Sequence, residues 1–165
     1  MVYFLDTNIF LRFFAKEGEV KVYNDCLKLI ENLKNARLKA VTSNLVLAEI
    51  VWVLGSTYKV SKFDISAILK AIESMSSLKI IDEFQTSLAN GLFENYSIKY
   101  IDALIASNPG IYSKEWTVVS YDKDFDKLGV IRKEPSEVST PNENVTPLPF
   151  RNVTPGNYYR VNTYL

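Results

Sequence analysis

The sequence of 165 residues contains no histidine and a single cysteine, Cys26. Without histidine there is no Ser-His-Asp or Cys-His nucleophile pair, no histidine general base and no histidine-ligated zinc or iron site. One cysteine cannot form an intramolecular disulfide or a two-cysteine metal clamp. Any chemistry therefore depends on carboxylates, hydroxyls, amides, lysine, arginine or a metal ion held by oxygen atoms. Sites built only from oxygen favour Mg²⁺, Mn²⁺ or Ca²⁺.

The sequence also has no excess of positive or negative charge, and its first residues do not resemble a targeting segment. The 19 Lys and Arg residues balance the 19 Asp and Glu residues, so any site for nucleic acid has to be local. The first residues, MVYFLDTNIFLRFF, have no basic region before the apolar run, and Asp6 interrupts that run. This segment is therefore neither a signal peptide nor a membrane span, and we expect a cytoplasmic protein that does not act at a membrane.

Short apolar runs alternate with longer amphipathic segments, and the length suffices for one domain with a substantial core. Strands are predicted at Val2–Leu5, Leu38–Val41, Leu78–Ile81, Thr117–Ser120 and Val130–Arg132. Helices are predicted at Ile9–Ala15, Val20–Leu33, Leu45–Leu54, from the cap Ser61 to Ile72, Phe84–Tyr96 and Ile101–Ala106, with a turn or short helix at Asp122–Leu128. The helix at Ile101–Ala106 is expected to end at Asn108-Pro109-Gly110. This alternation predicts an α/β fold with a mainly parallel sheet.

The composition changes near Pro135, because five of the six prolines lie at or after that position. The charged residues of 139–165 are Arg151, Arg160 and Glu143, and Asn-Val-Thr-Pro occurs twice, at 144–147 and 152–155. We therefore predict a domain at 1–135 and a Pro-rich C-terminal extension at 136–165, which is an extended tail or linker. The alternative is an arm that docks on a partner subunit, and its aromatic anchors would be Phe150, Tyr158, Tyr159 and Tyr164.

Four acidic positions fall where an α/β sheet places its chemistry. Asp6 ends the first predicted strand, and Asp122 follows the strand Thr117–Ser120, with Asp124 two residues further on. Ligands of open α/β sheets bind outside the carboxyl ends of the strands, where Asp6 and Asp122 would both lie. Glu49 and Asp102 lie inside strongly apolar helices. Each of these acids also has an ordinary structural interpretation.

Those alternatives are a helix cap for Asp6, a solvent-facing position for Glu49, an ion pair with Lys99 for Asp102, and a solvated turn for Asp122. Their joint order favours a shared site instead. Buried carboxylates are usually paired or bound to a metal ion, and converging carboxylates without a cation repel one another. A divalent cation removes that repulsion and keeps the carboxylates ionised, so the pattern predicts metal-dependent hydrolysis of a phosphodiester.

Four motifs together resemble those of the PIN domain family, and more narrowly those of VapC-type toxins of prokaryotic toxin–antitoxin pairs. The motifs are Phe4-Leu5-Asp6-Thr7-Asn8, Ala48-Glu49, Ile101-Asp102-Ala103-Leu104-Ile105-Ala106 and Val119-Ser120-Tyr121-Asp122-Lys123-Asp124-Phe125. The resemblance covers residues 1–135. It implies a PIN-like α/β fold, a three-layer α/β/α sandwich, and an endoribonuclease that depends on Mg²⁺ or Mn²⁺.

The resemblance also implies roles for particular residues. The catalytic acids would be Asp6, Glu49, Asp102 and Asp122, and Asp124 matches an auxiliary acid and metal ligand. Asp6, Asp102 and Asp122 would hold one or two ions directly, whereas Glu49 would bind a second ion or position the attacking water. The residues expected to hydrogen-bond these carboxylates or waters are Thr7, Asn8 and Ser120. Water attack would leave a 5′-phosphate and a 3′-hydroxyl.

Basic residues near the acids are candidate RNA contacts: Arg12, Lys123 and Lys127, which have solvation as their alternative role. The resemblance implies three partners, namely the RNA substrate, an antitoxin protein and a second copy of the chain. In the family, helices such as Val60–Ser74 form the homodimer and meet the antitoxin. The competing functions are a catalytically silent PIN-like module that binds RNA or protein, and a haloacid-dehalogenase-like phosphatase. The phosphatase chemistry needs a second aspartate at the position of Asn8.

Overall fold

The structure is a computed structural model that describes residues 2–16 and 18–138. Its sheet has five parallel strands in the order β3-β2-β1-β4-β5. The strands are β1 (Val2–Leu5), β2 (Ala40–Thr42), β3 (Leu78–Ile80), β4 (Trp116–Val119) and β5 (Arg132–Lys133). Strands β2 and β3 lie on one side of β1, and β4 and β5 lie on its other side. The order in which the parallel strands are added to the sheet therefore reverses between β1 and β4, and open α/β sheets bind ligands at such a point.

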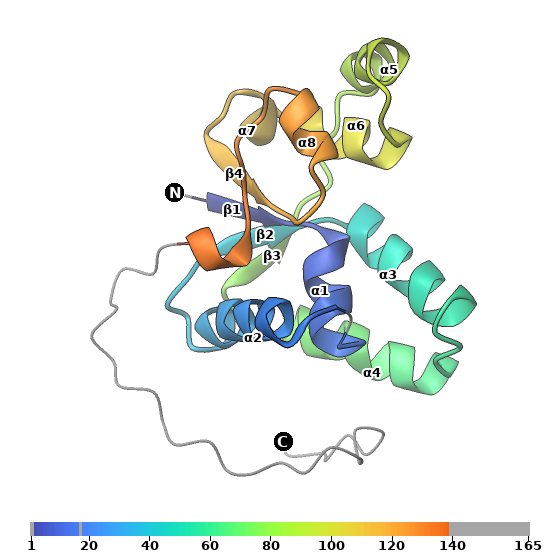
Figure 1. The fold of residues 1–165 in the computed structure, drawn as a ribbon, viewed down its shortest axis with the longest axis vertical. Coiled ribbons are helices and arrows are strands. Elements are labelled where there is room, and N and C mark those ends of the chain that lie inside the picture. Colours follow the sequence, from blue (N-terminus) through green and yellow to red (C-terminus); the bar gives the residue numbers. More distant parts are fainter. Residues whose placement is uncertain (1, 17, 139–165) are drawn as a thin grey trace.

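Helices cover both faces of the sheet and complete three layers (Figure 1). One layer holds α1 (Thr7–Phe14), α2 (Val20–Lys34), α3 (Asn44–Ser56) and α4 (Lys62–Glu73). The opposite layer holds α5 (Thr86–Asn95), α6 (Tyr100–Ala106), α7 (Pro109–Tyr112) and α8 (Asp124–Lys127). The predicted α/β class with a mainly parallel sheet and a PIN-like three-layer sandwich is confirmed.

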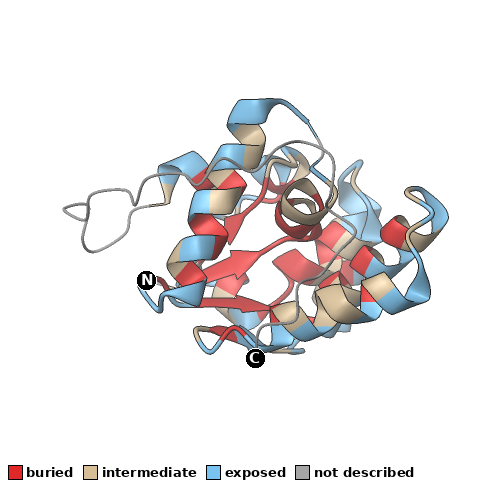
Figure 2. Cartoon of the chain, turned by 90° about the horizontal axis from the view of Figure 1, so that it is seen from below, coloured by how far each residue is buried: buried red, intermediate tan, exposed pale blue. Residues whose placement is uncertain are grey.

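The core lies on both sides of the central strand, and Figure 2 shows most of β1, β2 and β4 buried while the outward turns of the helices are exposed. Phe4 and Leu5 of β1 have no exposed surface, and neither does Phe10 of α1 nor Phe125 of α8. A strand that is buried on both faces needs a continuous apolar run rather than an alternating one. Val2–Leu5 is such a run, which explains why its boundaries were predicted correctly.

Side-chain caps start several helices, and the cap of α4 is the expected residue, Ser61. Ser61 Oγ accepts a hydrogen bond from Asp64 N at the start of α4, and Ser43 Oγ accepts one from Val46 N at the start of α3. The helix predicted at Leu45–Leu54 is slightly too short at both ends, since α3 spans Asn44–Ser56. No helix in the described part of the chain is both long and apolar enough to cross a membrane.

Residues 108–110 have a second role that the sequence analysis missed. The helix α6 does end before Asn108, but Asn108 also caps α7, because its side-chain oxygen accepts a hydrogen bond of 3.0 Å from Gly110 N. Pro109 occupies the first turn of α7, where its missing N–H costs no hydrogen bond. The chain beyond β5 forms a short 3₁₀ helix, Pro135–Glu137. Of the extension predicted at 136–165, the part from residue 139 onward, with its aromatic anchors, lies outside the described residues.

Candidate active site

The acidic side chains meet at the carboxyl edge of the sheet, beside the two central strands. Leu5 of β1 pairs with Val119 of β4, so the residues that follow each strand are neighbours. The backbone N–H of Asp6 donates a hydrogen bond of 3.2 Å to the carbonyl of Val119. This pairing brings Asp6 close to Ser120 and Asp122, as the positions after the two strands predicted.

Ser120 holds three parts of the site together. Its hydroxyl donates to Asp6 Oδ2 at 2.7 Å, and its oxygen accepts hydrogen bonds from Asn8 Nδ2 at 2.8 Å and from Asp122 N at 2.9 Å. A serine hydroxyl has one donor and two acceptor positions, so Ser120 is fully used. Because it is completely buried, water does not compete for these bonds.

Asp6 is surrounded by donors as well as by other acids. Its Oδ2 also accepts from Asn8 Nδ2 at 2.6 Å, and its Oδ1 accepts from Thr7 N at 2.7 Å, which caps α1. Burial raises the pKa of Asp6 to about 6, while the hydrogen bonds from Ser120 and Thr7 oppose that shift. The residues Thr7, Asn8 and Ser120 thus lie where they favour the ionised form of Asp6.

Asp102 is the most strongly perturbed acid of the site. Its side chain lies on α6, is only 4% exposed, and has an Oδ2 atom that is buried without a hydrogen-bond partner. Burial, together with the nearby charges of Asp6 and Asp122, raises the pKa of Asp102 to about 7. A buried carboxylate oxygen without a partner is costly unless a proton or a cation compensates it.

The residues present fit a divalent cation. Asp102, Asp122 and Asp124 each offer one carboxylate oxygen, and these three oxygens lie within 4.8 Å of one another. Oxygen atoms from several carboxylates are the ligands that Mg²⁺ and Mn²⁺ prefer. Asp124, which was expected as an auxiliary acid, is thus a member of the cluster, whereas Asp6 lies beside it and is held by hydrogen bonds.

Glu49 reaches the site from α3. Its Oε2 accepts a hydrogen bond of 2.5 Å from the Thr7 hydroxyl, and its charge contributes to the raised pKa of Asp6. The side chain is half-buried rather than solvent-facing. All four acids of the predicted quartet therefore lie at one edge of the sheet.

The predicted RNA contacts have different surroundings. The Arg12 guanidinium lies over the ring of Tyr121, 4.7 Å from its centroid, and Arg12 Nε is buried without a hydrogen-bond partner. Lys127 Nζ is 2.6 Å from Asp124 Oδ1, so it pairs with a member of the acidic cluster. Lys123 is exposed at the start of α8. Whether these residues contact RNA stays a prediction.

Lys99 is a residue of the site that the sequence analysis did not select. Its Nζ lies 3.4 Å from Asp122 Oδ2, and this is the ion pair that forms, rather than the one with Asp102 considered above. Burial lowers the pKa of Lys99, but the charges of Asp102 and Asp122 outweigh it, so its pKa lies above the ordinary value. Its position just before the Asp102 helix was the available sequence signal.

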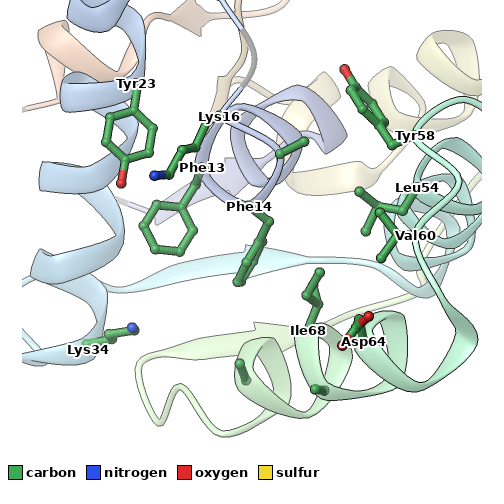
Figure 3. A pocket seen from close by; sticks show the side chains of 13 residues that line it. Phe13, Phe14, Lys16, Tyr23, Lys34, Leu54, Tyr58, Val60, Asp64 and Ile68 are labelled. Carbon is green, nitrogen blue, oxygen red and sulfur yellow. The ribbon is translucent and has the colours of Figure 1, made fainter. Parts of the chain in front are cut away.

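A separate apolar groove lies at the other end of α1 (Figure 3). It has a volume of about 460 Å³ and is formed by helices α1 to α4 and the segment between α3 and α4. Its main apolar lining residues are Phe13, Phe14, Leu54, Tyr58, Val60 and Ile68. Because Thr7 begins α1 at the acids and Phe14 ends it at the groove, the groove and the acidic cluster are distinct sites.

Comparisons with known proteins agree with the fold. The sequence pattern of the family described as PIN domain matches residues 3–131. Among solved structures, the chain is similar to a chain in the crystal structure of VapBC2 from Rickettsia felis. That structure contains VapBC2 bound to a DNA fragment from its promoter. The identity is 26%, the match covers 81% of this chain and 98% of that chain, and the TM-score is 0.56. No curated protein matches the chain.

Proposed function

The chain belongs to the PIN domain family, and from that premise we propose that it is a divalent-metal-dependent endoribonuclease, the toxin of a type II toxin–antitoxin pair. The nuclease class follows from the family. The observation that carries the metal dependence is the cluster of Asp102, Asp122 and Asp124, with a buried oxygen of Asp102 that lacks a partner. Three converging carboxylates and a raised pKa at Asp102 fit a site that takes up a cation.

In this proposal Asp102, Asp122 and Asp124 hold the ion, with Asp6 at its side. When bound, Mg²⁺ or Mn²⁺ would lower the pKa of a water molecule and offset the charge of the phosphoryl group. Ser120 and Asn8 orient Asp6 through their hydrogen bonds and keep it ionised. These ligands fit one ion or two.

Glu49 has the role of orienting the attacking water. Thr7 holds Oε2 of Glu49, and that leaves the second carboxylate oxygen for a proton of the water. Attack by water rather than by the ribose hydroxyl leaves a 5′-phosphate and a 3′-hydroxyl. The candidates for contacts with the phosphates of the RNA remain Arg12, Lys123 and Lys127.

The direct test is cleavage of RNA by the purified protein. We expect cleavage with Mg²⁺ or Mn²⁺, loss of cleavage in EDTA, and loss of cleavage in Asp102→Asn and Asp122→Asn. Asp126→Asn is the matched control, because Asp126 is on the same short helix as Asp124 but pairs with Arg132 instead of joining the cluster. Full cleavage by both site variants would contradict the proposed centre.

The competing function, a catalytically silent module that only binds RNA or protein, makes a different prediction. Such a module would release no heat when Mg²⁺ or Mn²⁺ is titrated into it, and EDTA would not change its binding of RNA. The acidic cluster argues for the nuclease. The phosphatase alternative is excluded by the family to which the chain belongs. Asn8 also occupies the position where the phosphatase chemistry needs an aspartate.

We further propose that the apolar groove binds an antitoxin protein. The similar protein from Rickettsia felis is named VapBC2, and a groove of this size with phenylalanine and isoleucine walls suits an apolar segment of a partner. Ala67→Arg would fill the groove without reaching the acids. We expect that variant to cleave RNA normally but to escape inhibition by the product of a neighbouring small open reading frame.

The homodimer stays a separate proposal. Trp52 on α3 is 68% exposed, and Phe63 on α4 is 81% exposed. Large exposed apolar side chains on two helices that pack together are typical of an interface. Light scattering should give twice the mass of one chain, and Phe63→Glu together with Trp52→Glu should give the mass of one chain.

A further inference from the structure

Lys99 occupies an unusual position relative to the acidic cluster. It immediately precedes α6, the helix that carries Asp102, while its ammonium group pairs with Asp122 from the loop after β4. The charges of Asp102, Asp122 and Glu49 all act on it. Lys99 is therefore the cation that faces the acids of two different elements.

Two lysines, Lys99 and Lys127, pair with acids of the cluster, and they differ in how firmly they are held. Lys127 Nζ lies 2.6 Å from Asp124 and also donates to the carbonyl of Ser97 at 3.2 Å. Lys99 Nζ lies 3.4 Å from Asp122, and its side chain is 66% exposed. A long, exposed ion pair contributes little stability and is easily exchanged. Lys99 is thus the cation that a competitor can displace.

We propose that Lys99 is a charge-exchange residue of the active site: its ammonium group balances Asp122 in the metal-free protein, and it moves to a phosphate of the bound RNA when a divalent cation takes up Asp102, Asp122 and Asp124. This inference rests on the proposed function and assigns a substrate contact to it.

The physical basis is that two cations compete for one carboxylate. A divalent ion on Asp122 repels an ammonium group placed beside it, and the loss of that pairing frees the side chain. Lysine carries its charge on a flexible four-carbon stem, so it can move without a change of backbone. The strongest negative group that an RNA strand brings to the cluster is a backbone phosphate, which lysine neutralises readily.

The first test measures metal binding alone. Mn²⁺ is titrated calorimetrically into the full chain without RNA, for the wild type, Lys99→Gln and Lys28→Gln. Lys28 is an exposed residue of α2, so the control loses the same charge elsewhere. We expect Lys99→Gln to bind Mn²⁺ about two- to fivefold more tightly than the wild type, and Lys28→Gln to equal the wild type. Unchanged or weaker binding by Lys99→Gln would overturn the exchange.

The second test measures RNA binding. Fluorescence anisotropy follows a labelled single-stranded RNA with Ca²⁺ present at increasing salt. Each phosphate contact contributes about 0.7 to the slope of log K against log salt for single strands, so Lys99→Gln should lose about that amount. Lys99→Arg should restore the slope, since it keeps the charge. A slope in Lys99→Gln equal to that of the wild type would overturn the phosphate contact.

The two proposals fail in different ways. If the wild type neither binds Mn²⁺ nor cleaves RNA, the proposed function is wrong. If the wild type does both, and Lys99→Gln shows wild-type metal affinity and salt slope, the charge exchange alone is wrong. A purely structural role for Lys99 would lower the melting temperature and could not tighten metal binding, so tighter binding supports the exchange.

Discussion

The hydroxyl of Thr7 donates a hydrogen bond of 2.5 Å to Glu49, a residue 42 positions later in the chain. Thr7 is the first residue of α1 and follows Asp6 directly, so one dipeptide supplies an acid of the site and orients a second. The same turn therefore serves as a helix cap and as part of the site. Asp-Thr-Asn is also a common sequence at the start of a helix. It therefore indicates a functional site only together with Glu49.

We predict that Thr7→Val slows cleavage without unfolding the protein. Valine keeps the shape of threonine but removes the donor to Glu49, and loss of one such supporting hydrogen bond commonly reduces activity about 10- to 100-fold. Steady-state kinetics should show the loss in kcat, because Glu49 would act on the attacking water. Thr7→Ser retains the hydroxyl and should keep most of the activity. Wild-type kcat in Thr7→Val would contradict this role for Thr7.

Ser120→Ala is expected to weaken metal binding. The substitution removes a donor to Asp6 and leaves Asn8 Nδ2 and Asp122 N without their shared acceptor. We expect a loss of about 10- to 100-fold in affinity for Mn²⁺ and about 1–3 kcal/mol in the free energy of unfolding. Calorimetry and urea unfolding would measure the two effects. Ser56→Ala removes only an exposed hydroxyl bonded to the carbonyl of Trp52, and its Mn²⁺ affinity should stay that of the wild type.

The stability of the metal-free protein should depend on the ionisation of Asp102. Its pKa is about 7 in the folded protein against an ordinary value of 3.8, so between these values the folded state holds a proton that the unfolded chain has released. The free energy of unfolding must therefore fall as the pH rises from about 4 to 7. Asp102→Asn removes this dependence.

The variant Asp102→Asn should accordingly be more stable than the wild type above pH 7, by on the order of 2–4 kcal/mol, with the difference shrinking towards pH 4. Urea unfolding in EDTA at several pH values would measure it. The pKa of Asp6 is also raised, so Asp6 also makes the free energy of unfolding fall as the pH rises. Because Asp6 is present in both proteins, its contribution largely cancels in the difference between them. A difference that does not change with pH would show that Asp102 is not the titrating group.

Two glycine substitutions should change stability in opposite directions. A Cβ atom at Gly110 would lie 2.5 Å from the ring of Trp116, so Gly110→Ala forces the indole to move and should cost about 1–3 kcal/mol. Gly91 lies within α5 with no atom within 4 Å of such a Cβ, and Gly91→Ala should add about 0.4–1 kcal/mol. Thermal unfolding of both variants would check this. A gain in stability for Gly110→Ala would contradict the packing described for α7.

Local sequence signals located most of the fold. The run Val2–Leu5 and the cap Ser61 were recognisable because the apolar pattern and the capping side chain act within a few residues. The shortest strands were displaced by one or two residues, since Ala40–Thr42 and Arg132–Lys133 are fixed by their pairing with β1 and β4. That pairing is a property of the assembled sheet and leaves no local signal.

In the site, too, some features have a local sequence signal and others depend on contacts in the folded protein. The acids could be found because strand ends and apolar helices marked Asp6, Glu49, Asp102 and Asp122 as exceptional. The inclusion of Asp124 in the tight cluster and the pairing of Lys99 with Asp122 depend on how α6 and the loop after β4 meet. Several rotamers of each long side chain are compatible with the sequence, so the choice between Asp102 and Asp122 as the partner of Lys99 required three-dimensional contacts.

The pairing of the first strand with the fourth has a consequence for the time at which the acidic site is completed during synthesis. Asp6 and Ser120 are separated by 114 positions, and a chain made at about 5–20 residues per second needs roughly 6–23 s to span them. Until β4 has left the ribosome, Asp6 lacks both the serine that orients it and Asp122 at its side. In the proposed function, the nuclease would therefore stay inactive beside the messenger from which it is translated until the chain has been made as far as Asp122.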